Sequence, residues 1–240
     1  MHFARDDGRG PDAADAEWSY WRPAEAGIVE LCALHGKRVG LPTHFHHESQ
    51  LTFVLSGRRR LVIRGEAIDL LPGQGAFIPA GVPHCSLPEP AGVVCFNAYL
   101  PAGEYAAGAM TEEMGRLWRR SGRIGWPELA EVIRGYRADV PVAPANPAIP
   151  LPMDSCETVG QMAARSGMSR EGFSRMFARR AGMPPHAFRL ASRLNRARAL
   201  LRAGEAIAGV AAETGFADQS HLGRCFRRAF GVTPGRYRAR

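Results

Sequence analysis

The sequence predicts an α+β protein with an N-terminal β-barrel or jelly roll and accessory helices, followed by an all-α domain with two helix-turn-helix motifs. Three observations support this fold class. Residues 27–100 contain short apolar runs separated by turn residues. Residues 139–153 carry a proline at nearly every second or third position. Residues 154–240 contain the same short pattern twice, about 49 residues apart.

The first domain is predicted to cover residues 18–138, after a polar arm at 1–17 that we expect to be disordered. Within it, apolar or β-branched runs alternate with turn residues such as Ser56-Gly57 and Pro72-Gly73. This rhythm is typical of a small antiparallel barrel or jelly roll. The expected strands are 28–34, 50–55, 60–64, 66–70, 76–79 and 93–100.

Histidines stand out in two segments of this domain. On a strand, residues two apart point to one face, so His44 and His46 would both face the interior while His47 faces outward. Segment 40–57 resembles the first motif of the cupin family, and segment 73–84 resembles the second. The resemblance implies a cupin barrel whose pocket is lined by His44, His46, Gln50 and His84.

The occupant of this pocket is left open by the sequence. Metal-binding cupins normally have a glutamate where this chain has Gln50, and a neutral amide is a weaker ligand, although Glu48 lies on the same strand face by parity. A divalent transition metal (Zn, Ni, Fe or Mn) held by His44, His46, Gln50 and His84 is one interpretation. The other two interpretations are an effector pocket without a metal and a set of histidines packed in the core. The packed core is least favoured for His46, because two histidines two positions apart rarely both lie in a dry core.

Residues 103–138 are expected to be helical. Trp126-Pro127 begins a helix in which Leu129, Val132, Ile133 and Tyr136 follow helical spacing. Such helices either pack on their own barrel or form a dimer interface. The prolines of 139–153 exclude helix and central strand, and they predict an extended linker between the domains.

The repeated pattern of 154–240 has the features of a helix-turn-helix. In each copy a small residue precedes a turn glycine by four positions, a polar residue caps the second helix, and an apolar pair four residues apart faces the core. These residues are Ala163, Gly167, Ser169, Phe173 and Phe177 in the first copy, and Ala211, Gly215, Asp218, Leu222 and Phe226 in the second.

A single helix is expected to join the two copies over residues 185–202. Leu190, Leu194, Ala197 and Leu201 lie on one face of it, and five arginines cover the others. Spacing alone does not decide which arginines contact phosphates and which contact acidic side chains. A rigid helix would hold the two motifs at a fixed separation, and one turn of DNA requires about 34 Å.

Charge separates the two halves. Residues 153–240 contain 16 Arg and 6 Asp+Glu, a net charge of +10, whereas residues 1–152 have a net charge of −2. A basic helical half is the pattern expected for phosphate binding, and it argues against a duplicated helical hairpin without a nucleic-acid partner. No apolar run reaches 18 residues and the first twenty lack a signal-peptide core, which predicts a cytoplasmic protein without membrane contact.

The segment 157–238 resembles the DNA-binding domain of the AraC/XylS family of transcription regulators, in its Phe-Ser-Arg-Met-Phe run and above all in Gly-Phe-Ala-Asp-Gln-Ser-His-Leu. Arg175 and Arg224 would be the strongest base contacts, since Arg to guanine is the commonest specific contact, with phosphate contact as the alternative. The resemblance implies base contacts from Glu171, Ser174, Arg175, Ser220, His221 and Arg224.

Together these features predict a regulator rather than an enzyme, with double-stranded promoter DNA and a small-molecule effector as partners. The resemblance also implies a homodimer and allows contact with RNA polymerase. The alternative is a metal-dependent cupin enzyme fused to a DNA-binding module. Two features argue against that alternative: Gln50 stands where metal-binding cupins normally have a glutamate, and the tandem motif is basic.

Overall fold

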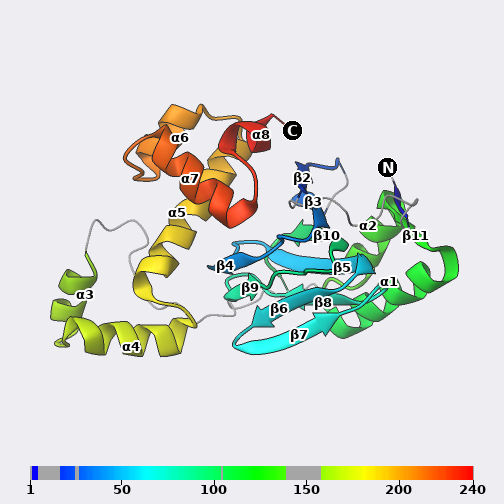
Figure 1. The fold of residues 1–240 in the computed structure, drawn as a ribbon, viewed down its shortest axis with the longest axis horizontal. Helices are drawn as coiled ribbons and strands as arrows, with labels where there is room; N and C mark the ends of the chain where they lie inside the picture. Colours follow the sequence, from blue (N-terminus) through cyan, green and yellow to red (C-terminus); the bar gives the residue numbers. More distant parts are fainter. Residues whose placement is uncertain (1, 5–16, 25–26, 104, 139–157, 240) are drawn as a thin grey trace.

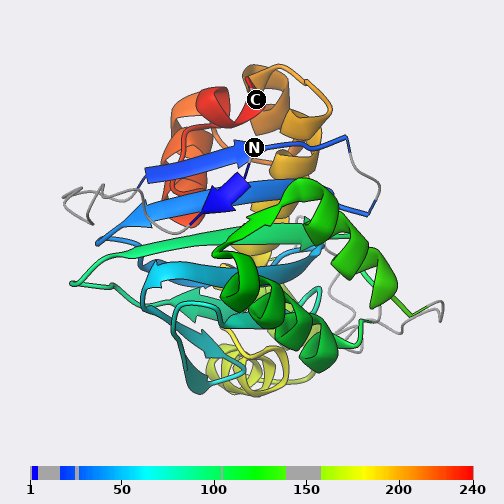
Figure 2. The same ribbon diagram turned by 90° about the vertical axis from the view of Figure 1, so that its right-hand side faces the viewer.

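The computed structural model describes residues 2–4, 17–24, 27–103, 105–138 and 158–239, and Figures 1 and 2 present two views of it. Strands dominate the N-terminal part, and the C-terminal part is helical, which confirms the α+β prediction. The strands are β1 (His2–Ala4), β2 (Glu17–Trp21), β3 (Glu30–Gly36), β4 (Leu41–His44), β5 (Ser49–Gly57), β6 (Arg59–Ile63), β7 (Glu66–Leu70), β8 (Gly75–Ile78), β9 (His84–Ser86), β10 (Val93–Leu100) and β11 (Arg123–Gly125). The helices are α1 (Ala107–Ser121), α2 (Trp126–Gly135), α3 (Val159–Arg165), α4 (Arg170–Ala181), α5 (Pro185–Arg202), α6 (Ile207–Glu213), α7 (Gln219–Phe230) and α8 (Pro234–Arg238).

Two antiparallel sheets form the barrel. One has the strand order β2-β3-β10-β5-β8 and the other β4-β9-β6-β7. Five strands, β1, β2, β4, β9 and β11, were not among those expected from the sequence, and β11 lies within the segment 103–138 that was expected to be helical. Residues 2–4 and 17, placed in the disordered arm by the sequence, lie in β1 and β2, and β1 pairs with β11. The predicted linker at 139–153 and positions 1 and 5–16 of the arm lie outside the described residues.

The five-stranded sheet has one face inside the barrel and one face against helices. Its inner face carries a row formed by Glu30 on β3, Tyr99 on β10 and Gln50 on β5, which are direct cross-strand partners. Its outer face packs against buried side chains of α1 and α2, such as Trp118 and Ile133. These two helices cover the sheet in Figure 2. Their apolar sides are therefore buried on their own barrel.

The C-terminal helices form two helix-turn-helix units, α3–α4 and α6–α7, at the two ends of α5 (Figure 1). The turn glycines Gly167 and Gly215 have φ values of 63° and 73°, as the tight turns require. Ser169 accepts a hydrogen bond from the Gly172 amide, and Asp218 accepts one from the His221 amide. The predicted caps and the predicted joining helix are therefore confirmed.

One end of the barrel, bounded by β4 and residues 45–48 and here called the mouth, is covered by α5 and α7. Both helices pack against β4, and one apolar cluster continues from Val54 in the barrel to Leu201 and Phe226. Tyr20 also donates a hydrogen bond to the Phe230 carbonyl at 2.8 Å. The C-terminal helical half therefore closes the barrel. Among the described helices, none combines the length and apolarity needed to cross a membrane.

Candidate functional site

The six residues expected to contact DNA lie on α4 and on α7. Arg175 and Arg224 are exposed, and no hydrogen bond or ion pair within the described part of the chain involves either side chain. His221 is half-buried, with its ring edge-on to Phe216 at 5.3 Å. Both arginines are therefore available to a ligand, whereas His221 is partly held by its own domain. Of the others, Glu171 and Ser220 are exposed and Ser174 is half-buried.

The arginines of α5 have different partners, which spacing alone could not distinguish. Arg193 donates to the Thr214 carbonyl at 2.7 Å, at the end of α6, and Arg196 pairs with Glu213 at 3.0 Å on the surface. Arg198 and Arg202 instead point to the barrel. The joining helix thus contacts both the second helix-turn-helix unit and the cupin-like half.

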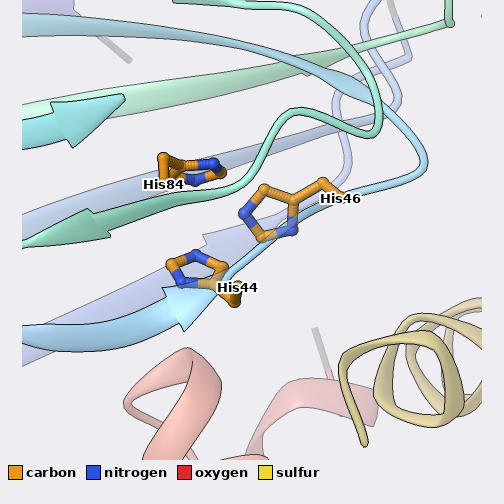
Figure 3. A group of neighbouring side chains, drawn as sticks. All are labelled: His44, His46 and His84. Atoms are coloured by element: carbon orange, nitrogen blue, oxygen red, sulfur yellow. The ribbon is translucent and has the colours of Figure 1, made fainter. Parts of the chain in front are cut away.

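Three histidines meet inside the barrel, with their rings close together (Figure 3). His44 ends β4, His84 begins β9, and His46 lies in the loop between β4 and β5. The ring centroid of His44 lies 4.4 Å from that of His84 and 4.8 Å from that of His46. One ring nitrogen from each lies within 4.8 Å of the other two. β4 ends at His44, so strand alternation does not determine the direction of the His46 side chain. The loop between β4 and β5 turns His46 inward.

Hydrogen bonds to the backbone orient two of the rings. The Nδ1 of His44 lies 2.7 Å from the Pro42 carbonyl, and the Nδ1 of His84 lies 2.9 Å from the Val82 carbonyl. A carbonyl only accepts, so both Nδ1 atoms carry the proton and both Nε2 atoms keep a lone pair. The Nε2 of His84 is buried without a hydrogen-bond partner among the described residues. This arrangement is the one that metal-binding histidines adopt.

His46 carries its proton on the other ring nitrogen. Its Nδ1 lies 3.1 Å from Nη1 of Arg198. A guanidinium has no acceptor, so this Nδ1 must accept, and the neutral ring carries its proton on Nε2. That Nε2 is buried and unpartnered. In this structure two histidines present lone pairs to the common space, and the third presents an N–H as long as Arg198 is present.

The three rings are neutral at physiological pH. Burial is the main cause: it lowers the pKa of His44 to about 4 and that of His84 to about 3. The pKa of His46 is also lowered, first by burial and then by the neighbouring His44 and Arg198. Neutral imidazoles are the form that binds a metal ion.

The donor set fits a divalent transition metal in part. Three imidazoles with lone pairs would suit an ion such as zinc with an open fourth position. Gln50, the fourth expected ligand, instead donates to Asn97 at 3.2 Å, and its carbonyl oxygen Oε1 has no hydrogen-bond partner among the described residues. Glu48 faces α5, where it pairs with Arg202 at 2.5 Å. His44, His46 and His84 would therefore hold the ion without a carboxylate, provided that the proton of His46 leaves Nε2.

Spacing did not single out Arg198 among the arginines of α5, and it did not indicate Glu30, Tyr99 or Tyr237 as its partners. This side chain of α5 is 0% exposed and forms an ion pair with Glu30 of β3, which is also 0% exposed. Its Cζ lies 3.9 Å from the ring centroid of Tyr99, and its Nε donates to the hydroxyl of Tyr237 at 3.1 Å. Burial lowers the pKa of Arg198, but Glu30, Tyr237, Tyr99 and Glu48 together outweigh this effect and the pKa is raised, so the group stays charged.

Comparison with known proteins matches both halves of the chain. Residues 31–87 match the cupin domain family, and residues 162–240 match a helix-turn-helix domain family. The chain is 32% identical over 112 residues to the HTH-type transcriptional regulator MtrA of Neisseria gonorrhoeae, a match that covers 46% of this chain. It spans 37% of the length of that relative.

Two solved structures are also similar. A transcriptional regulator with an AraC-type DNA-binding domain from Chromobacterium violaceum is 32% identical, with a TM-score of 0.32, over 35% of this chain and 75% of that one. ToxT from Vibrio cholerae O395 is 10% identical, with a TM-score of 0.47, over 93% of this chain and 97% of that one. From the family matches, the chain joins an N-terminal cupin domain to a C-terminal helix-turn-helix domain.

Proposed function

We propose that this protein is a sequence-specific regulator of transcription that binds double-stranded promoter DNA through two helix-turn-helix units, under control of a small molecule or metal ion in its cupin pocket. The observation that carries the proposal is the position of α5. This helix joins the two units and also places Arg198 in the barrel, 3.1 Å from His46. A ligand that changes the pocket therefore acts directly on the element that spaces the units.

The dimensions of α5 support simultaneous binding of two major grooves. Its 18 residues correspond to a length of about 27 Å, and successive major grooves on one face of a duplex are about 34 Å apart. We propose that Glu171, Ser174 and Arg175 of α4 contact one groove and that Ser220, His221 and Arg224 of α7 contact the next. Arg175 and Arg224 would read bases, and the remaining exposed arginines would bind phosphates.

The pocket supports a sensor more than an enzyme. A substrate would have to pass α5 and α7 at every turnover, because the histidines are no more than 8% exposed. A sensor needs this coupling, since a ligand shifts a conformational equilibrium only if it binds the two states differently. We propose a non-enzymatic protein that acts in the cytoplasm, as a homodimer with RNA polymerase as a further partner. The apolar sides of α1 and α2 pack against the barrel. A dimer interface formed by these helices would therefore consist of their polar sides.

In vitro selection from a randomised DNA duplex library tests this function. We expect enrichment of a site with two half-sites about one helical turn apart, bound in fluorescence anisotropy far more tightly than a scrambled duplex. The Arg175→Ala, Arg224→Ala double variant is the control and should enrich nothing. Recovery of no common sequence by the unmodified protein, in both the presence and the absence of a divalent metal, would overturn the proposal.

A further inference from the structure

Most groups around the guanidinium of Arg198 belong to the cupin domain, while Tyr237 of α8 and Phe230 of α7 contribute from the other domain. Glu30 accepts from Nε at 3.1 Å and also from Nη2. Glu48 lies 3.7 Å from Nη1, and the ring of Tyr99 lies under the Cζ at 3.9 Å. In-plane carboxylates and an aromatic face are the features that recognise a planar cation. These residues, Glu30, Glu48 and Tyr99, together with His46 at Nη1, are called the cation cage below.

The charge of the cage is balanced entirely from the other domain. Among the described residues, the ion pairs of Glu30 and Glu48 are all with Arg198 and Arg202 of α5. The buried Arg59 of the barrel donates instead to Val39 and Ser86. If α5 leaves the mouth, two carboxylates lose their cations, and Glu30 is 0% exposed. A carboxylate that stays buried without a counter-charge is strongly unfavourable, so a cation that takes the place of Arg198 beside Glu30 is favoured.

The interior next to the cage has unused polar atoms. One carboxylate oxygen of Glu30, Oε1, is buried with no hydrogen-bond partner among the described residues, and the same holds for Nε2 of His46, Nε2 of His84 and Oε1 of Gln50. Glu30 and Gln50 flank Tyr99 in the inner row of the sheet. Buried polar atoms without partners are rare in folded proteins. Their grouping here indicates a place for a polar ligand that continues inward from the cage.

We propose that the cupin pocket is a receptor for an organic cation with a guanidinium head, that Arg198 occupies this receptor from within the chain, and that the ligand and α5 exclude each other. This deepens the proposed function, on which its consequence for DNA binding rests, by naming the effector class. A competing ligand must overcome the effective concentration of a tethered side chain, which lies in the millimolar range. The unused polar atoms beyond the cage supply the additional contacts that such a ligand needs.

The test is chemical rescue of Arg198→Ala. This substitution removes the fragment that corresponds to ethylguanidine, so ethylguanidine is the probe, and ethylurea is its neutral control of the same shape. We expect ethylguanidine at low millimolar concentration to raise the melting temperature of Arg198→Ala in a saturable way, whereas ethylurea does not. The matched control is Arg196→Ala, which removes a surface arginine of the same helix and should show no rescue.

Two further variants make the result decisive. The stabilisation by ethylguanidine should disappear in the double variant Glu30→Gln, Arg198→Ala, because the cage loses its buried charge. If Arg198→Ala does not fold, Arg198→Lys keeps a cation but not the planar fork. Ethylguanidine should then bind Arg198→Lys at least about tenfold more tightly than the unmodified protein, in which the tethered guanidinium competes. Calorimetry measures this without DNA. Equal effects of ethylguanidine and ethylurea, or rescue that survives Glu30→Gln, would overturn the receptor, while a failed DNA selection alone would overturn only the regulatory function.

Discussion

Arg198 of α5 and Glu30 of β3 form an ion pair between the two domains in which both side chains are 0% exposed. The two residues are 168 positions apart in the sequence. Because the pair is buried, its value to stability depends on both partners being present: removal of one leaves the other charged and desolvated. This pair makes the closed arrangement of barrel and helices sensitive to single substitutions.

Substitution of Glu30 by glutamine is expected to lower the free energy of unfolding by about 3 kcal/mol, since it leaves Arg198 buried without its main counter-charge. The double variant Glu30→Gln, Arg198→Met should lose less than the two single variants combined, because no unpaired charge remains. Urea denaturation followed by tryptophan fluorescence measures both. The control Arg196→Ala removes an exposed ion pair with Glu213 and should cost less than about 1 kcal/mol. Additive losses in the double variant would contradict a coupled buried pair.

The sequence predicted the local features of this protein better than its long-range ones. The bounds of α5 and the caps Ser169 and Asp218 follow from residues close together in the chain. The strands β4 and β9 were missed because they are short and because His44 and His84, polar residues, lie at their ends. The Arg198–Glu30 pair could not be predicted, since a run of arginines on a helix carries no information about which strand lies opposite.

The grouping of His44, His46 and His84 had a signal in the sequence, namely two motifs with histidines at spacings that suit neighbouring strands. The argument from strand spacing was incomplete for His46. This residue lies in a loop, and Arg198 determines which of its ring nitrogens carries the proton. That contact comes from another domain. The chemical state of the pocket therefore depends on residues that no pattern within the barrel sequence includes.

Removal of Arg198 is expected to strengthen metal binding. In Arg198→Ala the Nδ1 of His46 no longer accepts from a guanidinium, so the proton can move to Nδ1 and the Nε2 can bind a metal ion with His44 and His84. A change of this kind in a ligand's hydrogen bonding alters metal affinity by about 10–100-fold. Titration with Co²⁺, followed by its visible absorption, measures this in protein purified without a chelator or a His-tag.

The matched control for the metal titration is Arg202→Ala, which removes a cation of the same helix that pairs with Glu48 but leaves the contact between Arg198 and His46. Its Co²⁺ affinity should change much less than that of Arg198→Ala. His44→Ala should abolish binding in both backgrounds. Equal affinities in the unmodified protein and in Arg198→Ala would mean that Arg198 does not control the third ligand.

Acid should destabilise the metal-free protein through the buried histidines. In the folded state the pKa of His44 is about 4 and that of His84 about 3, against about 6.5 in an unfolded chain. Below pH of about 6.5 the unfolded chain binds protons that the folded protein does not, so the free energy of unfolding decreases as the pH falls towards 4. Each histidine contributes about 1.4 kcal/mol per pH unit in this window.

Urea denaturation in EDTA at several pH values between about 7 and about 5 measures this slope. His84→Gln is the informative variant, because it removes one titrating ring while keeping a polar side chain in the pocket. Its stability should depend less steeply on pH than that of the unmodified protein. His186 is an exposed histidine, and His186→Gln should leave the slope as it was. The same slope in all three proteins would show that other groups cause the acid sensitivity.

Loss of either recognition arginine should weaken specific DNA binding. Arg175 of α4 and Arg224 of α7 are exposed, and neither has a partner among the described residues. If each reads a base, Arg175→Ala and Arg224→Ala each cost about 1–3 kcal/mol on the selected site and relax the sequence preference at one half-site only. Fluorescence anisotropy with duplexes mutated in one half-site at a time assigns each arginine to its half-site.

A phosphate contact would give a different result in the same measurements. Affinity would then fall about equally for every sequence, and the salt dependence of binding would decrease by about one unit of slope. Arg134→Ala, which alters an exposed arginine of α2 in the other domain, should change neither affinity nor slope. Retention of full affinity and full sequence preference by Arg224→Ala would exclude this residue from the interface. The surface of α7 would then have to bind DNA through Ser220 and its neighbours, which offer fewer and weaker hydrogen bonds to base edges.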